Sequence, residues 1–515
     1  MGLFKETRTL LDADPALANT PTEKGDLPLH LAAGRQGLFK LLLRRGADIH
    51  AKDARGYTAL LAAREAENEK AVQELLQRGV PDDIFGAIAA GDMQKVKAFL
   101  QADPNQAHPI DNGPAPIMWA VRFGHKAMVE LLLEQRVEVD IWRGHSDTHK
   151  AHTPLNVAID YQYTDIVRRL LEYGADPDPE DLRPWPGHNG PDTPLFWGGW
   201  DRPFARALRW GNLEALELLL DAGADINRPQ RGGLHWPAWR NNLPQAKFLI
   251  DRGADLRLPH NVEALIDAAE EGYTAFVELL ATHGADVQAK EKKKNRTALR
   301  QALKQGQTET VALLRELIDL EGRPQTERER ILRLRAQFID AAIDGEADVT
   351  RDLLEQDPTL LQREMVRTDL FHHVAYAGHQ AVADVLVEYG TPWTMTAAVA
   401  LGRVDQVEAM IEADPTFIQR LELFRIAAKA DQGEVIGLLL DRGMEIDKRS
   451  PDRGNAALHE AVNVSSVNAV DVLLSRGAQV NIKNRDGRTP LGVYMFDSVQ
   501  RDKIRAQLLA HGATR

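Results

Sequence analysis

Short apolar runs recur along this chain, and a glycine follows each of them closely. Leu218–Leu220 precede Gly223, and Leu438–Leu440 precede Gly443. An apolar run of this kind is typical of the buried face of a helix, and the glycine after it suits a left-handed cap. The pattern predicts units made of a short helix, a turn at glycine or asparagine, and a second helix that ends in the leucines. One such unit cannot bury its apolar face alone, so neighbouring units must stack.

The spacing inside these units is the same in distant parts of the sequence. Gly46 is followed by a second glycine ten residues later and by a leucine fourteen residues later, and Gly477 starts the same spacing. A Thr-Pro-Leu sequence opens several units, because threonine can cap a helix and proline is tolerated in its first turn. The tail that closes a unit recurs at Gly174-Ala175-Asp176, Gly223-Ala224-Asp225, Gly253-Ala254-Asp255 and Gly284-Ala285-Asp286.

These motifs resemble the ankyrin repeat, whose hallmarks are Thr-Pro-Leu-His-x-Ala and a later Gly-Ala-Asp. The matching segments are Pro28-Leu29-His30-Leu31-Ala32, Thr153-Pro154-Leu155, Thr193-Pro194-Leu195, Leu458-His459-Glu460-Ala461 and Thr489-Pro490-Leu491. The resemblance is to long arrays of prokaryote-like, partly degenerate repeats. It implies an all-α solenoid of about 14 to 15 helix–loop–helix repeats of about 33 residues each. It also implies a curved superhelix with a concave face.

A second type of repeat carries Asp-Pro in place of Gly-Ala-Asp. Its members share one frame from glycine to proline, at 2–15, 91–104, 345–358 and 402–415. The first of these frames belongs to a second helix whose partner helix is absent from the sequence. Either the protein is trimmed before Met1, or this half-repeat serves as a cap.

Three insertions and one charged stretch interrupt the array. We expect an N-terminal array over 1–320, a charged helical linker or degenerate repeat over 321–335, and a C-terminal array over 336–515. The insertions fall at 143–152, at the proline-rich 178–192 and at 196–203. Because loops carry function more often than the scaffold does, the insertions are candidate walls of a binding site.

Composition narrows the possible functions. The formal net charge of −13 disfavours nucleic acid as a partner, and there is no cysteine for a disulfide, a thiol nucleophile or a zinc site. No apolar window is long enough to span a membrane. Nucleotide-binding and hydrolase motifs are missing from the sequence, so we expect no cofactor and lean against an enzyme. We expect a cytoplasmic protein, although a removed export signal would leave the same N-terminus.

Candidate binding residues come from the two variable positions before each inter-helix turn, which in ankyrin repeats usually face the concave side. Four adjacent repeats carry aromatic and charged residues there, at Arg122-Phe123, Asp160-Tyr161, Arg209-Trp210 and Trp239-Arg240. Trp197 and Trp200, in the third insertion, are further candidates. Aromatic residues and arginine dominate binding hot spots, so this stretch is where we expect a ligand.

Other candidates have a competing structural interpretation. Trp119 and Trp236 occupy a normally packed position of the repeat, and we expect them in the core. The tryptophans of the insertions could pin a loop as well as bind. His145, His149 and His152 have spacing that a metal could use, but a solvated hairpin tip is the favoured interpretation.

Three hypotheses about function remain open, the third being self-assembly through exposed terminal repeat faces that stack end to end. The first is a non-catalytic scaffold that binds a protein or peptide on the concave face of the central N-terminal repeats. The second is a small-molecule or carbohydrate site, possibly enzymatic, in a pocket rich in tryptophan, arginine and histidine and walled by the insertions at 143–203.

Overall fold

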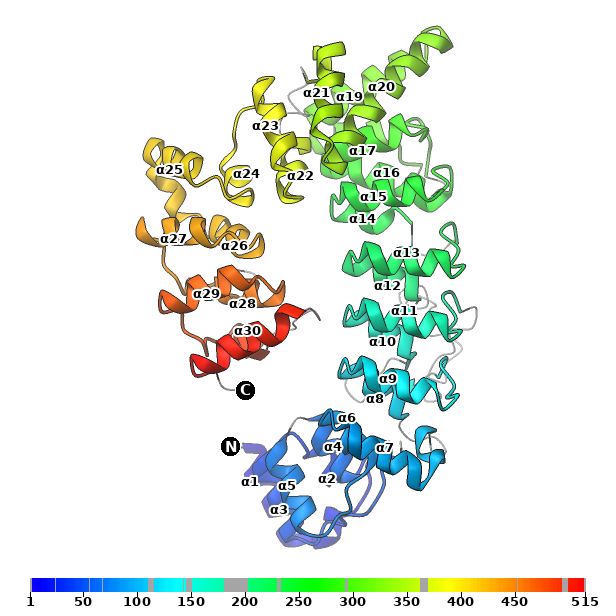
Figure 1. Ribbon diagram of the computed structural model, residues 1–515, viewed down its shortest axis with the longest axis vertical. Coiled ribbons are helices and arrows are strands. Elements are labelled where there is room, and N and C mark those ends of the chain that lie inside the picture. Colours follow the sequence, from blue (N-terminus) through cyan, green and yellow to red (C-terminus); the bar gives the residue numbers. More distant parts are fainter. Residues whose placement is uncertain are drawn as a thin grey trace. The chain divides into compact units, whose positions relative to one another are not determined.

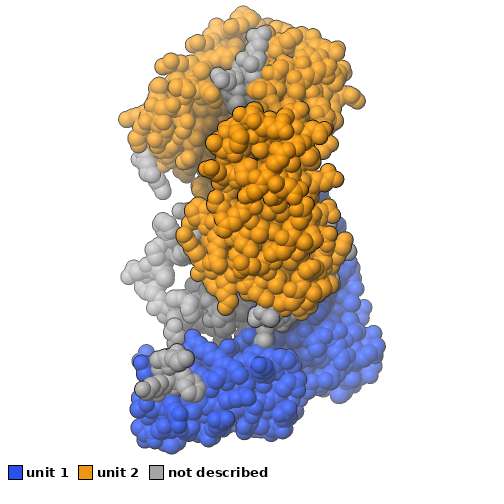
Figure 2. Space-filling model, turned by 90° about the vertical axis from the view of Figure 1, so that its left-hand side faces the viewer, with its two compact units in different colours: residues 1–207, 214–224 blue, residues 208–213, 225–515 orange. Residues whose placement is uncertain are grey.

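A computed structural model gives the fold as two compact units. Unit 1 comprises residues 1–207 and 214–224, and unit 2 comprises 208–213 and 225–515 (Figure 2). The structure describes residues 2–513 apart from 24, 55, 67, 110–114, 142, 145–150, 180–201, 229–232, 292–294, 362–368, 452 and 493–498. Each unit is an all-helical stack apart from one strand pair, which confirms the predicted solenoid (Figure 1).

Unit 1 begins with α1, which contacts α3, and continues as helix pairs in sequence order. Its elements are α1 (Gly2–Ala13), η1 (Pro15–Ala18), α2 (Pro28–Leu31), α3 (Gln36–Arg44), α4 (Ala59–Glu65), α5 (Glu69–Gln77), α6 (Ile84–Ala89), α7 (Met93–Ala102), η2 (Pro104–Ala107), α8 (Pro116–Arg122), α9 (Lys126–Leu133), β1 (Arg143–Gly144), β2 (Ala151–His152), α10 (Pro154–Asp160) and α11 (Thr164–Glu172). The two short strands pair antiparallel at the ends of the first insertion. The boundary between the units passes through the next pair, α12 (Pro203–Trp210) and α13 (Leu213–Asp221).

Unit 2 repeats the same helix pair over the remaining residues. Its elements are α14 (His235–Trp239), α15 (Leu243–Asp251), α16 (Pro259–Glu271), α17 (Thr274–Thr282), α18 (Ala298–Gln305), α19 (Thr308–Leu320), α20 (Gln325–Asp344), α21 (Ala347–Gln356), η4 (Pro358–Leu361), α22 (Phe371–Tyr376), α23 (Gln380–Glu388), α24 (Met395–Ala400), α25 (Val404–Ala413), η6 (Pro415–Gln419), α26 (Leu421–Lys429), α27 (Gly433–Asp441), α28 (Ala457–Asn463), α29 (Val467–Ser475), η7 (Pro490–Gly492) and α30 (Val499–Ala510).

The ends of the helices follow the predicted chemistry. Thr153 precedes α10, and its hydroxyl accepts a hydrogen bond from the backbone N–H of Asn156 at 3.2 Å, with Pro154 in the first turn. After the second helix, Gly174 adopts a φ of +89°, a left-handed conformation that costs glycine nothing. Start and stop signals of this kind fix the length of each helix locally.

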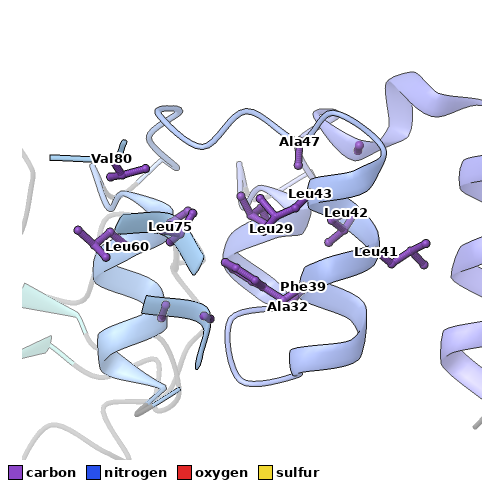
Figure 3. Packing of buried hydrophobic residues seen from close by; sticks show 14 of the residues in the cluster. Leu29, Ala32, Phe39, Leu41, Leu42, Leu43, Ala47, Leu60, Leu75 and Val80 are labelled. Carbon is purple, nitrogen blue, oxygen red and sulfur yellow. The ribbon is translucent and has the colours of Figure 1, made fainter. Parts of the chain in front are cut away.

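Stacking of the pairs makes the core. In the first repeats, Leu29 of α2 and Phe39 and Leu42 of α3 belong to one buried hydrophobic cluster with side chains of α4 and α5, such as Leu60 (Figure 3). These four side chains are at most 2% exposed. Each repeat therefore covers the apolar face of its neighbour, as the repeat hypothesis requires.

A recurring hydrogen bond joins one repeat to the next. The residue that begins a second helix reaches back to a backbone carbonyl at the end of the first helix of the preceding repeat. Examples are Asn68 Nδ2 to Ala33 O at 2.7 Å, Gln307 Nε2 to Glu270 O at 3.1 Å, His379 Nε2 to Ile343 O at 2.9 Å and Gln432 Nε2 to Ala400 O at 2.9 Å. Carbonyls at a helix end lack partners within their own helix, so this bond satisfies a group that would otherwise be unpaired.

The same bond gives a second reason for glycine at some of the inter-helix turns. Gly272 ends α16 with a φ of +80°, and a Cβ placed on it would lie 2.5 Å from Oε1 of Gln307. Gly306 ends α18 with a φ of +75° but has no atom within 4 Å of such a Cβ. Glycine at 272 thus serves both the backbone conformation and the close approach of the next repeat.

We expect Gly272→Ala to destabilise unit 2 more than Gly306→Ala does. Each substitution costs about 1 to 2 kcal/mol for the left-handed backbone, and Gly272→Ala costs roughly 1 kcal/mol more for the displaced Gln307 hydrogen bond. Thermal unfolding of the two variants measures the difference. Adding Gln307→Ala to the Gly272→Ala variant should lower its stability little further, because the hydrogen bond is already displaced. Equal losses of stability in Gly272→Ala and Gly306→Ala would contradict this explanation.

Helix α20, with 20 residues, is the longest that the structure describes, and it packs against more than its own repeat. It contacts α15 and α17 as well as α21. Two ion pairs support this packing. Asp340 Oδ2 of α20 lies 3.3 Å from Nε2 of His283, just after α17, and Asp344 Oδ2 of α20 lies 3.1 Å from Lys247 Nζ of α15. The predicted division into arrays at 321–335 stays a prediction.

Stability of this packing should depend on the protonation of His283. Burial opposes the charged form, but hydrogen bonds to Asp340 and to a backbone carbonyl outweigh it and raise the pKa of His283. The stabilisation is then complete below the ordinary histidine pKa and is lost as pH rises through the raised value. We expect His283→Gln to cost roughly 1 kcal/mol at acidic pH and much less at alkaline pH.

Thermal midpoints of the wild type and the variant, measured on both sides of neutrality, test this expectation. His511→Gln, at an exposed histidine of the last repeat, is the matched control. A loss that is the same at both pH values would show that the charge of His283 is irrelevant.

Candidate functional site

Two of the predicted variable pairs lie in unit 2 and carry tryptophan beside arginine. Trp210 ends α12, with the guanidinium carbon of Arg209 at 5.4 Å from its ring centre. Trp239 ends α14, and the guanidinium carbon of Arg240 lies 5.9 Å from its ring and 5.6 Å from that of Trp236. The interaction of an arginine cation with a tryptophan ring holds both side chains in place. We call Arg209, Trp210, Trp239 and Arg240 the Arg–Trp surface.

The positive charge of this surface is not balanced by the residues around it. Both Arg209 and Arg240 are exposed, and neither forms an ion pair with any residue that the structure describes. Partial burial lowers the pKa of Arg240, and the neighbouring charge of Arg209 lowers it further. Two arginines that repel each other without a carboxylate between them form a site suited to an anion.

Trp239 is the most exposed aromatic side chain of this surface. It is 63% exposed, whereas Trp236 behind it is 6% exposed and meets it edge to face at 5.3 Å. Trp119 is likewise buried at 3%, so the expectation that Trp119 and Trp236 belong to the core is confirmed. An exposed indole backed by a buried one is a rigid apolar contact surface.

The other two variable pairs lie in unit 1 and are already engaged. Asp160 forms an ion pair with the buried Arg206, which gives its carboxylate a structural partner. Tyr161 stacks on Tyr163 at 5.6 Å.

Phe123 packs on its neighbours in a similar way. Its ring lies 5.6 Å from that of Trp119 and 6.1 Å from that of His125, and the Arg122 guanidinium carbon lies 6.0 Å from it. All four side chains of these two pairs are half-buried, whereas Arg209, Trp239 and Arg240 of the Arg–Trp surface are exposed and Trp210 is half-buried.

The remaining candidates cannot be placed in this geometry. Trp197 and Trp200 lie outside the described residues, as do His145 and His149. His152 lies in the short strand β2.

A pocket that the sequence did not indicate lies beside the Arg–Trp surface in unit 2. It has a volume of about 540 Å³ and is lined by the turn between α14 and α15, including Arg240, and by residues at and before α22. Asp369 joins the two sides. Its Oδ1 accepts from Asn241 Nδ2 at 3.2 Å, and its Oδ2 accepts from the backbone N–H of Ala275 at 3.1 Å.

Histidine and tyrosine side chains form the other wall of the pocket. His372 stacks on Tyr376 at 5.2 Å, and Tyr376 is 52% exposed. Burial lowers the pKa values of His372 and His373 and raises that of Tyr376, so all three are neutral at physiological pH. The pocket therefore offers aromatic surface next to one unpaired cation.

No local signal in the sequence reveals this pocket. The hydrogen bond between Asn241 and Asp369 joins residues 128 positions apart. By sequence alone, His372-His373 resembles part of a degenerate repeat, and Tyr376-Ala377 resembles an ordinary variable pair. Only the packing of α22 near α14 and α15 brings them to Arg240.

Comparison with protein families agrees with the repeat architecture. Models of three consecutive ankyrin repeats match residues 84–181, 234–323, 394–484 and 423–513, and a model of one ankyrin repeat matches residues 24–54. Together these segments cover more than half of the chain. The chain belongs to the ankyrin-repeat family. The described part of this ankyrin-repeat protein contains no helix that is long and apolar enough to cross a membrane.

Individual relatives share only part of the sequence. Human ankyrin repeat and SOCS box protein 11 is 33% identical over 139 residues, which are 26% of this chain and 36% of that protein. An ankyrin repeat protein of fowlpox virus is 41% identical over 81 residues, which are 16% of this chain and 24% of that protein. The crystal structure of the human ASB11 ankyrin repeat domain aligns at 25% identity and a TM-score of 0.25, covering 47% of this chain and 97% of that domain. The matched segments thus span about a third or less of the length of these curated relatives.

We expect Asp369→Ala to lower the stability of unit 2 by about 2 kcal/mol, because it leaves Asn241 and the first turn of α17 without an acceptor. Asp384→Ala is the matched control. It removes an exposed carboxylate that pairs with Arg403 at 2.5 Å, and should cost less than about 1 kcal/mol. Chemical denaturation of both variants measures the difference. A loss no larger than that of the control would show that Asp369 does not hold α22 to α17.

Proposed function

We propose that this protein is a non-catalytic scaffold that binds a partner protein through the Arg–Trp surface. Ankyrin repeats generally mediate protein–protein interactions, and family membership supports that general role here. The observation that carries the proposal is the 63% exposure of Trp239 beside the unpaired Arg240. Tryptophan and arginine are the residues most enriched in binding hot spots.

Physical reasoning favours a protein partner for this surface. An exposed indole gains free energy when a partner buries it, at roughly 25 cal/mol for each Å² of apolar area. The arginine beside it can form charge-assisted hydrogen bonds to carboxylates of the partner. The pairs Arg122-Phe123 and Asp160-Tyr161 in unit 1 are proposed as a second, weaker contact, since their side chains are half-buried and internally packed.

The alternative of a ligand site walled by the insertions has no observation in its favour among the described residues. Its proposed walls lie largely at 145–150 and 180–201, outside the part that the structure describes. A catalytic role would need a constellation of reacting groups, and none of the described contacts of the Arg–Trp surface supplies one. We therefore base the proposal on protein binding alone.

Affinity capture from a lysate of the source cells tests the proposal. We expect Trp239→Ala combined with Arg240→Ala to lose at least 90% of the proteins retained specifically by the wild type, about the tenfold effect of 1.4 kcal/mol. Mass spectrometry of the captured proteins provides the measurement.

Arg420→Gln is the matched control, because this arginine also lies over an aromatic ring, at 4.6 Å from that of Phe417, but on another repeat. It should leave capture unchanged. If the double variant retained the same proteins as the wild type, the partner would not bind at the Arg–Trp surface.

A further inference from the structure

The pocket beside the Arg–Trp surface has an uneven distribution of charge. At one side stands Arg240, which has no carboxylate partner among the described residues and lies close enough to Arg209 to be affected by its charge. At the other side stands Asp369, whose oxygens accept from Asn241 and Ala275 and whose Oδ1 lies 3.6 Å from His373 Nε2. Among the charged groups that line the pocket, the guanidinium of Arg240 is therefore the one without a polar partner among the described residues.

One wall of the pocket is aromatic. His372 and Tyr376 form a stacked pair on one turn of α22, and Trp239, outside the pocket lining, stands next to Arg240. A volume of about 540 Å³ lies in the range that holds a small ligand or a few peptide side chains. An occupant that fits would carry a negative group for the arginine and an apolar or aromatic group for the rings.

We propose that this pocket binds a carboxylate-bearing segment of the partner protein, with the carboxylate on Arg240 and an adjacent aromatic side chain against His372 and Tyr376. The inference rests on the proposed function and deepens it by naming the chemistry of the partner. The carboxylate can come from an aspartate or glutamate side chain or from the C-terminus of the partner, because the guanidinium binds either in the same way.

The surrounding charges fix the direction in which such a segment binds. Glu422 of α26 acts electrostatically on both His372 and Tyr376, and Asp369 acts on His372 as well. A carboxylate placed over the rings would be repelled by these two groups, whereas one placed at Arg240 is attracted. The acidic group of the partner must therefore lie at the arginine side, with its aromatic neighbour over α22.

The same charges argue against a polyanion. A nucleic acid strand brings one phosphate for each nucleotide, and its binding strength comes from many lysine and arginine contacts. Here one arginine, Arg240, lines the pocket together with Asp369, and Glu422 acts on the opposite wall, in a protein whose net charge is −13. A single carboxylate satisfies the arginine without bringing further negative charge towards the acidic side.

Three short probes separate the sources of the carboxylate. N-acetyl-Glu-Phe-amide carries it on a side chain, N-acetyl-Gly-Phe carries it at the C-terminus, and N-acetyl-Gln-Phe-amide is the neutral control. Each is made with 4-fluorophenylalanine and titrated with the full-length protein, and fluorine NMR reports binding. We expect dissociation constants on the order of 1 mM or below for at least one carboxylate probe, and at least tenfold weaker binding of the neutral probe.

Variants then test the two parts of the pocket. Arg240→Gln should weaken binding of the favoured probe at least tenfold, to the level of the neutral one, and Arg420→Gln should leave it unchanged. Tyr376→Ala should weaken binding of all three probes, because it removes the ring that the phenyl group contacts. Thermal unfolding shows whether each variant remains folded.

The proposal is overturned if the neutral probe binds as tightly as the acidic ones, if Arg240→Gln leaves binding unchanged, or if no probe binds at several times the ~1 mM scale expected. Preferential binding of a short oligonucleotide, displaced by phosphate, would also overturn it. Failure here is distinguishable from failure of the proposed function. Loss of captured proteins in the Trp239→Ala, Arg240→Ala variant would still support protein binding when no acidic probe binds.

Discussion

Stacking of the repeats is supported by one hydrogen bond that recurs between neighbouring repeats. The side chain that begins a second helix donates to a backbone carbonyl at the end of the preceding first helix, as Gln307 does to Glu270. The bond is short in space but joins residues more than thirty positions apart, so it forms only when the repeats stack. It accounts for the glycine at 272, because a larger residue there would occupy the place of the Gln307 amide.

The candidate site occurs where this arrangement changes. The turn after α14 has Asn241 instead of glycine, still with a positive φ of +50°. Asp369 accepts from the side chain of Asn241 and, with its second oxygen, from the start of α17. Asp369 thus ties a later part of unit 2 to this turn, beside the pocket.

The chemistry of that pocket follows from which charges are satisfied. Many of the described arginines form ion pairs with carboxylates, as Arg206 does with Asp160. Arg209 and Arg240 lie against tryptophan rings and pair with no carboxylate of the described residues, which leaves their charge available there. In an acidic protein, such a local excess of positive charge beside exposed aromatic rings is a reason to expect an acidic protein segment as the partner.

The sequence by itself determined the repeat, the ends of its helices and the positions of its variable pairs. These depend on contacts between residues a few positions apart, such as Thr153 with Asn156 or the left-handed Gly174, and local spacing is visible in a sequence. The tertiary structure alone decided which of those pairs are available for binding. Asp160 forms an ion pair with Arg206, 46 positions away, and Asp369 accepts a hydrogen bond from Asn241, 128 positions away. No periodic pattern in the sequence encodes these two pairings. Their partners are set by how the stacked repeats pack, which is a property of the whole unit.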